Sequence, residues 1–559
     1  MVTRVLTLFY REIKGLHQAA YILALFTLAS QILAVVRDRI LAHQFGAGPE
    51  LDIYYAAFRI PDLLFVLFAS VLSVYVLLPF VTRAREEKDD AAGAHVLSVM
   101  FSLFLCVYAV GAVIVFIAAP YLVPLLFSGF DSVAYTDIIL LLRILLLQPL
   151  LLGVSSLLGV VTQLQHRFVV YALSPLVYNI GIIIGVTVFY PLFGVAGLAY
   201  GVVLGAVGHV LVQLPLVYHS SLSFQFIRKI DIGLILKVTA VAIPRALTLS
   251  LNQIQFMAFV SIASFMAIGS ISVLQFAYNL QSVPLAIIGM SYSVAAFPTL
   301  TELIAKQKQQ QFNEYVITAL RHIIFWSVPI IALVIVLRAQ IVRVLLGSGS
   351  FDWGDTRLTA ATLGLFVLSL TAQALLLLLI RALYAGGKTW VPFVITIIGS
   401  LVGIATTISL YYTFTASLAV QTFMSTLFRL EDIDGVEVLT LPLGFTIGVL
   451  IELILMTLAI RFIFKMSLRS LFRPLVVAAV AAAAGGVATY GTLAFIVEGV
   501  NQNTFIGIFL QGLAGGIVGL MVVISTYYIF RSPELSEIYK SFKTRLFKTD
   551  VVAPQPDVI

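Results

Sequence analysis

The chain has 559 residues, of which 61% are hydrophobic and 11% are charged, and its mean hydropathy is +1.08. Soluble domains are about 45–50% apolar and about 25% charged, so this composition excludes a soluble globular protein and predicts an integral membrane protein. The formal net charge of +7 follows from basic loops on one membrane side and does not indicate a nucleic-acid partner. Cys106 is the single cysteine, which excludes an internal disulfide and a cysteine-based metal site.

Apolar segments of membrane-spanning length recur along the whole chain. A span needs about 20 mostly apolar residues, and about fourteen segments meet this requirement, so we expect an all-α integral membrane fold. The segments cover residues 19–42, 52–82, 93–119, 135–164, 168–190, 194–218, 232–264, 270–301, 313–346, 357–385, 389–413, 440–464, 471–496 and 504–530. Proline inside the longer segments predicts kinks at Pro149, Pro175, Pro244, Pro284 and Pro329.

The connecting loops alternate in charge. Every second loop is rich in Lys and Arg, whereas loops 43–51, 120–134, 191–193, 265–269 and 497–503 contain neither residue. The positive-inside rule therefore predicts an even number of spans with both termini in the cytoplasm. Residues 1–18 are then a cytoplasmic N-terminal segment, and 531–559 a cytoplasmic basic tail on the anionic inner leaflet.

Short motifs repeat at a constant spacing. Asp131 and Asp352 follow similar Leu-Leu and Gly-Phe patterns 221 residues apart (131 to 352), and Gly48 and Gly269 share this spacing. The repeat predicts two six-helix lobes, an N-lobe at 19–219 and a C-lobe at 232–465, followed by two helices at 471–530. Parallel repeats around a central site are a recurrent architecture of transporters.

Several charged residues lie within the predicted spans. A charge in mid-membrane costs at least about 2.5–3.5 kcal/mol, so each is a candidate functional residue. Three arginines, Arg37, Arg59 and Arg245, suit bidentate binding of phosphate or carboxylate. The alternative is structural, because Asp38 follows Arg37 directly and a buried ion pair would clamp two helices. The further charged candidates are Arg39 and Asp52.

No sequence motif of a soluble enzyme is present. The chain lacks a phosphate-binding GxxxxGK[ST] loop, an HExxH zinc motif and a GxSxG nucleophile elbow. We therefore expect no enzymatic activity, no catalytic residue, no cofactor and no metal.

Residues 34–64, AVVRDRILAHQFGAGPELDIYYAAFRIPDLL, resemble the N-terminal signature of the MurJ/MviN lipid II flippases. That family belongs to the multidrug/oligosaccharidyl-lipid/polysaccharide exporter superfamily. Further matching motifs are YALSPLVYNIGIIIG at 171–185, IPRALTLSLNQI at 243–254, QFAYNLQSVPLAIIG at 275–289 and RALYAGGKT at 381–389. The resemblance extends from about residue 20 to residue 465.

The resemblance implies a transporter with two lobes around a cationic central cavity. It implies that the protein moves lipid II, an undecaprenyl-pyrophosphate-linked precursor of peptidoglycan, from the inner to the outer leaflet by alternating access. In this reading Arg37, held by Asp38, binds the pyrophosphate and Arg59 and Arg245 assist. The implied partners are lipid II, membrane lipids and cell-wall synthesis proteins.

Three positions depart from the family pattern. Gln31, Phe65 and Asn279 stand where the family has arginine, which leaves other cargoes open. One alternative is a flippase for another polyprenyl-linked oligosaccharide. Another is a drug or cation antiporter, for which Asp38 and Glu452 would be the carboxylates. A third is a scaffold without transport activity.

Overall fold

The computed structural model of the chain is helical. It describes residues 16–69, 71–218, 220–227, 231–496 and 504–539, and within these ranges there is no β-strand. The predicted segment before Leu16, the basic residues Arg228 and Lys229, the loop 497–503 and the tail from Lys540 lie outside the described residues. The all-α membrane fold that the sequence predicts is confirmed.

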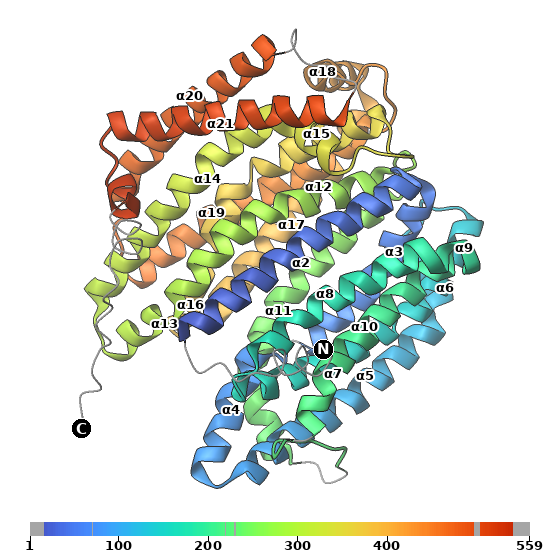
Figure 1. Cartoon of the computed structure of the whole chain (residues 1–559), viewed down its shortest axis with the longest axis vertical. Coiled ribbons are helices and arrows are strands. Elements are labelled where there is room, and N and C mark those ends of the chain that lie inside the picture. The colour runs from blue at the N-terminus through green and yellow to red at the C-terminus, as the bar shows by residue number, and fades with distance from the viewer. Residues whose placement is uncertain (1–15, 70, 219, 228–230, 497–503, 540–559) are drawn as a thin grey trace, which may run out of the picture. The chain divides into compact units, whose positions relative to one another are not determined.

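The helices follow one another in the order shown in Figure 1. The first are α2 (Leu16–Phe45), α3 (Pro49–Leu64), α4 (Val74–Glu87), α5 (Asp90–Leu126), α6 (Ser132–Leu145), α7 (Leu147–Leu164), α8 (Phe168–Ile184), α9 (Tyr190–Phe193), α10 (Val195–Tyr218) and α11 (Ile232–Ala263). The later ones are α12 (Ser270–Leu285), α13 (Ser291–Ala305), α14 (Gln309–Leu345), α15 (Trp353–Val367), α16 (Leu370–Ala385), α17 (Trp390–Ala416), α18 (Leu418–Phe428), α19 (Thr440–Ile463), α20 (Phe472–Ile496) and α21 (Phe505–Ile529). Three π-helices interrupt this order, η1 (Phe65–Ala69), η2 (Gly185–Phe189) and η3 (Ala286–Met290).

Length and hydropathy identify most of these helices as membrane spans. Among the described residues, eleven helices are long and apolar enough to cross a bilayer, or twelve if α15 and α16 form one bent span. The total of fourteen remains a prediction. A helix satisfies its own backbone hydrogen bonds, which is why an apolar chain of this kind crosses the hydrocarbon layer as helices.

The chain divides into two compact units. The first comprises Met1–Leu280, Leu345–Phe366 and Lys388–Glu452, and the second comprises Gln281–Val344, Val367–Gly387 and Leu453–Ile559. This division cuts across the N-lobe and C-lobe expected from the repeat, so the two six-helix lobes remain a prediction.

The internal repeat is visible in the backbone. The π-helix η3 begins 221 residues after η1 (65 to 286), which is the spacing of the repeated sequence motifs. Asp131 accepts a hydrogen bond from the Ala134 N–H at 2.8 Å and so caps α6, while Asp352 accepts one from the Asp355 N–H at 2.8 Å at the start of α15. Asp131 and Asp352, which are equivalent in the repeat, therefore each cap the N-terminus of the helix that follows.

Glycines set the closest helix contacts in the first unit. Helix α8 packs on both α2 and α10 (Figure 1). A Cβ added to Gly201 on α10 would lie 2.3 Å from the Cα of Gly185, and Gly403 on α17 faces Gly448 on α19 in the same way. Small residues at such positions let two membrane helices approach within backbone contact.

Three features differ from the sequence expectation. The apolar helix α18 lies inside the loop 414–439, where no helix was expected. The π-helix η1 begins four residues after Pro61, which was not among the expected kink points. A proline ring removes one backbone donor from a helix, which accounts for a break near this position. Pro329, by contrast, lies inside the uninterrupted helix α14.

Candidate functional site

A small polar cavity in the first unit collects several of the predicted site residues. Its volume is about 140 Å³. Helix α2 contributes Arg37 and Asp38, α3 contributes Arg59, and α12 contributes Asn279. The remaining residues of its wall are Leu41, Tyr54, Tyr55, Phe58, Asp62, Tyr178, Ile182 and Gln275. Residues from four helices therefore meet at one site, as the family resemblance leads us to expect for Arg37, Asp38, Arg59 and Asn279.

The Arg37 guanidinium is held by two neighbours. Its Nε and Nη2 atoms donate to Asp38 Oδ1 at 2.9 and 2.7 Å, and its Nη1 donates to Asn179 Oδ1 at 2.9 Å. The side chains of Arg37 and Asp38 are 21% and 10% exposed. The pair is therefore largely desolvated, and its mutual attraction offsets part of the cost of burying each charge.

The hydrogen bonds continue from Asp38 to Arg59. The Nδ2 atom of Asn279 donates to Asp38 Oδ2 at 3.0 Å, and Gln275 Nε2 donates to Asn279 Oδ1 at 2.7 Å. Arg59 Nη2 in turn donates to Gln275 Oε1 at 2.7 Å. This chain connects the two arginines through neutral amides and joins α2, α3 and α12.

Arg59 has two further contacts that fix its orientation. Its Nε donates to the Tyr55 carbonyl at 2.9 Å, and its guanidinium carbon lies 4.8 Å from the centre of the Phe256 ring. A cation over an aromatic face is attracted by the negative charge of that face, and the attraction is stronger away from water. Arg59 is buried, so its geometry is set by α3 and α11 together.

The formal charges around this cavity cancel. Arg37 and Arg59 are balanced by Asp38 and Asp62, and Gln148 hydrogen-bonds the Asp62 carboxyl. The resemblance implies a cationic cavity, and this one is neutral overall. Its arginines remain the only cationic groups among its lining residues.

Asp52 lies apart from the cavity and has a different role. Its carboxylate accepts hydrogen bonds from the Gly269 N–H at 2.6 Å, the Ser272 N–H at 2.8 Å and the Ser272 hydroxyl at 2.7 Å. These donors belong to the first turn of α12, so Asp52 caps that helix from α3. The structure brings Asp52 to a helix terminus, and not to the cavity.

Arg39 and Arg245 also lie outside the lining of this cavity. Arg39 is half-buried and its Nη1 lies 3.5 Å from the Leu345 carbonyl. Arg245 is half-buried on α11. Their predicted part in binding cargo therefore has no support from the geometry of the cavity around Arg37.

The three departures from the family pattern lie in different surroundings. Gln31 lines a separate cavity of about 450 Å³ whose walls carry hydroxyl, amide and imidazole groups but no Asp, Glu, Lys or Arg. Phe65 begins the π-helix η1. Asn279 lies in the cavity of Arg37 and holds Asp38 there.

Three cavity residues were not singled out from the sequence, and a fourth, Asp62, counted only among the charged residues within the predicted spans. Asp62, Tyr178, Asn179 and Gln275 all contact or line the cavity. A signal was available for each, because Asp62 is a charge inside a span and the other three lie within motifs that match the family. Only the packing of α2 against α8 and α12 shows that they share one site.

The family model and the relatives that match this chain carry the same description. A family model described as Lipid II flippase MurJ matches residues 41–431. A probable lipid II flippase MurJ of Thermotoga maritima is 29% identical over 409 residues, which cover 72% of this chain and 81% of the relative. The lipid II flippase MurJ of Burkholderia cenocepacia is 24% identical over 390 residues, covering 66% of this chain and 74% of the relative.

Solved structures show the same fold. A structure of lipid II flippase MurJ in an inward closed conformation matches with a TM-score of 0.70 and 20% identity, covering 91% of this chain and 99% of that chain. An inward-facing multidrug resistance MATE family transporter of the MOP superfamily matches with a TM-score of 0.64 and 16% identity, covering 79% of this chain and 96% of that chain. Because the family model matches more than half of its length, this multi-pass membrane chain belongs to the lipid II flippase MurJ family.

Proposed function

We propose that the protein transports lipid II from the inner to the outer leaflet of the bacterial cell membrane by alternating access. The observation that carries the proposal is the partly buried series of hydrogen bonds from Arg37 to Arg59, in a protein of the MurJ family. The proposal includes the predicted arrangement of two six-helix lobes and cytoplasmic termini. It requires no chemical step, because the cargo crosses the membrane unchanged.

In this proposal the pyrophosphate binds at Arg37. The three nitrogens of its guanidinium donate to Asp38 and Asn179. An arriving pyrophosphate would take some of these donors and would be repelled by the Asp38 carboxylate. Its net affinity is therefore moderate, which favours transport, since a carrier that holds one state too tightly cannot release its cargo.

Asn279 and Gln275 keep the other polar groups of the cavity hydrogen-bonded while Arg37 moves its donors from Asp38 to the pyrophosphate. Asn279 continues to donate to Asp38 when Arg37 turns to the cargo, so the carboxylate does not remain buried without a partner. Gln275 connects this change to Arg59. Arg59 then acts as a second cation for the phosphates.

Replacement of Arg37 tests the proposal. We expect Arg37→Ala to abolish growth of cells depleted of their own flippase, at normal expression of the variant, and to abolish lipid II transfer across proteoliposomes. Arg39→Ala is the matched control, because Arg39 lies two residues away on α2 but outside the cavity, and it should support growth.

A folding defect must be separated from loss of binding. Arg37→Ala removes the counterion of the Asp38 carboxylate, which then keeps only the hydrogen bond from Asn279. The double variant Arg37→Ala/Asp38→Asn therefore removes both charges together. Both variants should be inactive while the double variant retains the thermal stability of the wild type. Normal growth with either variant would contradict a role of Arg37 in transport.

A second candidate function is the transfer of another polyprenyl-linked oligosaccharide. Two cavity residues favour it, because Gln31 and Asn279 both stand where the family has arginine. The cavity that Gln31 lines has no Asp, Glu, Lys or Arg in its walls, and Asn279 lines the cavity of Arg37. Proteoliposomes that contain lipid II or an undecaprenyl-pyrophosphate-linked glycan of different sugar composition distinguish the two cargoes. Antiport has less support, because Asp38 is hydrogen-bonded to Arg37 and Glu452 accepts from the Thr396 hydroxyl at 2.7 Å.

A further inference from the structure

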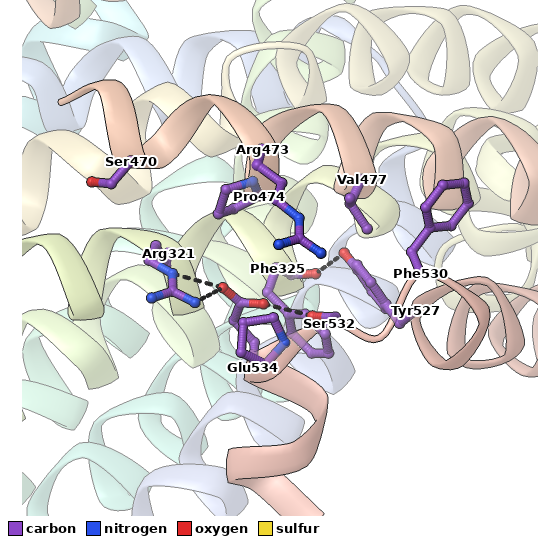
Figure 2. Close-up of a pocket in the computed structure, with 11 residues that line it drawn as sticks. Arg321, Phe325, Ser470, Arg473, Pro474, Val477, Tyr527, Phe530, Ser532 and Glu534 are labelled. Atoms are coloured by element: carbon purple, nitrogen blue, oxygen red, sulfur yellow. Dashed lines mark hydrogen bonds and ion pairs between the residues drawn. The ribbon is translucent and has the colours of Figure 1, made fainter.

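A second charged pocket lies in the second unit, where α14, α20 and the segment after α21 meet (Figure 2). Its volume is about 210 Å³. Arg321 comes from α14, Arg473 from the first turn of α20, and Glu534 from the helical residues 533–539. Phe325 and Tyr527 form part of its apolar wall. It shares no residue with the cavity around Arg37.

One of its two arginines is already neutralised. Arg321 Nε and Nη2 donate to Glu534 Oε1 at 2.8 and 2.7 Å, and the Ser532 hydroxyl donates to Glu534 Oε2 at 2.5 Å. Burial alone would raise the pKa of Glu534, but the hydrogen bonds from Ser532 and Arg321 hold the pKa below its ordinary value. Glu534 is therefore ionised at neutral pH and cancels the charge of Arg321.

The other arginine has no counterion among the described residues. Arg473 is exposed, and neither a carboxylate nor any other polar group of the described chain pairs with it. Figure 2 shows its guanidinium pointing into the pocket, between the Arg321–Glu534 pair and Tyr527. The three charged side chains leave a net charge of +1, located on a group with five unused donors.

The surroundings of Arg473 indicate what kind of anion would fit. The neighbouring positions on α20 expose large apolar side chains, with Phe472 at 72%, Leu475 at 46% and Val476 at 44%. This helix is long and apolar enough to cross a bilayer, and exposed apolar side chains on such a helix suit contact with lipid chains. An unpaired cation beside lipid-facing apolar surface suits a ligand with a phosphate at one end and hydrocarbon at the other.

We infer that this pocket binds the phosphate of an anionic membrane lipid, with Arg473 as the principal ligand. Arg321 contributes to the electrostatic potential but remains tied to Glu534. The site is separate from the proposed cargo site, and its occupation would stabilise the contact between the chain end and α14.

The test uses the purified full-length protein and phosphatidylglycerol, with bound lipid counted by native mass spectrometry. We expect the wild type to retain phosphatidylglycerol in preference to phosphatidylcholine, and Arg473→Gln to lose affinity about tenfold, as expected for a charge-assisted contact. Arg469→Gln is the matched control, since it removes the same charge four residues earlier, outside the pocket. It should bind like the wild type.

Two further measurements separate the alternatives. Glu534→Gln frees Arg321 and raises the net charge of the pocket to +2, so it should increase phosphatidylglycerol retention. Inorganic phosphate, added as a competitor, should not displace the lipid. Equal losses in Arg473→Gln and Arg469→Gln would indicate general membrane charge and overturn the site, and displacement by inorganic phosphate would assign it to a soluble anion instead.

Discussion

At the scale of single residues, position in the fold separates charges that look alike in the sequence. Arg37 and Asp52 lie in the same segment, residues 34–64; Arg37 is half-buried and Asp52 is buried. Arg37 faces a cavity, whereas Asp52 satisfies three donors at the start of α12. A buried carboxylate with three donors is a structural group, because removing it leaves those donors without a partner away from water.

Removal of the Asp52 carboxylate should therefore reduce stability and leave cargo binding intact. We expect Asp52→Ala to lower the free energy of unfolding by about 1–3 kcal/mol, seen as a lower thermal midpoint in detergent. Asp131→Ala removes a single capping bond on α6 and should cost less. If Asp52→Ala lost lipid II binding at unchanged stability, Asp52 would belong to the binding site after all.

At the scale of helices, close packing depends on glycine and on local breaks. Gly181 on α8 and Gly185 at the start of η2 are in backbone contact with Gly201 and Gly205 on α10. This contact holds Asn179 on α8 near Arg37 on α2. The π-helix η1 follows Arg59 and Asp62 on the same span. Such local breaks often lie beside functional residues, and here one separates the cavity residues of α3 from α4.

A single methyl group should disturb the contact between α8 and α10. Gly201→Ala would place its Cβ 2.3 Å from the Cα of Gly185, and overpacking of this kind costs about 1–3 kcal/mol. Gly491 on α20 has no atom within 4 Å of an added Cβ, so Gly491→Ala should be neutral or stabilise by up to about 1 kcal/mol. Thermal unfolding in detergent measures both, and equal midpoints for the two variants would refute the packing argument.

At the scale of the whole molecule, the repeat and the charge bias describe a protein that crosses the membrane many times. The helix caps and π-helices recur at the spacing of the sequence repeat. The acidic loop that follows α18 is fastened by Arg357, whose guanidinium contacts Asp432 at 2.9 Å. The direction of the chain through the membrane is predicted from the loop charges and is open to direct measurement.

Site-directed labelling should establish the direction. In a Cys106→Ala background, Asp434→Cys should react with a membrane-impermeant maleimide in intact cells. Gln307→Cys should react only after permeabilisation, because its loop is predicted to be cytoplasmic. Both positions are exposed in the structure. The opposite pattern of labelling would place the termini outside the cytoplasm.

The sequence by itself determined the fold class, the approximate helix positions and the family. Hydropathy and charge bias are local properties, so they can be read along the chain without knowing which helices are neighbours. The same holds for the repeat, in which Asp131 and Asp352 each cap the helix that follows them. The grouping of Arg37, Arg59 and Asn279 as candidates for one site came instead from the resemblance to the family.

Only the tertiary structure decided what each polar residue contacts. It assigned Asp52 to a helix cap, left Arg39 and Arg245 outside the cavity lining, and added Asp62, Asn179 and Gln275 to the site. These assignments depend on contacts between residues that are far apart along the chain, such as Arg37 and Asn179, which are separated by 142 positions. Hydrogen bonds act over about 3 Å, so no pattern along the chain specifies them until the helices have packed.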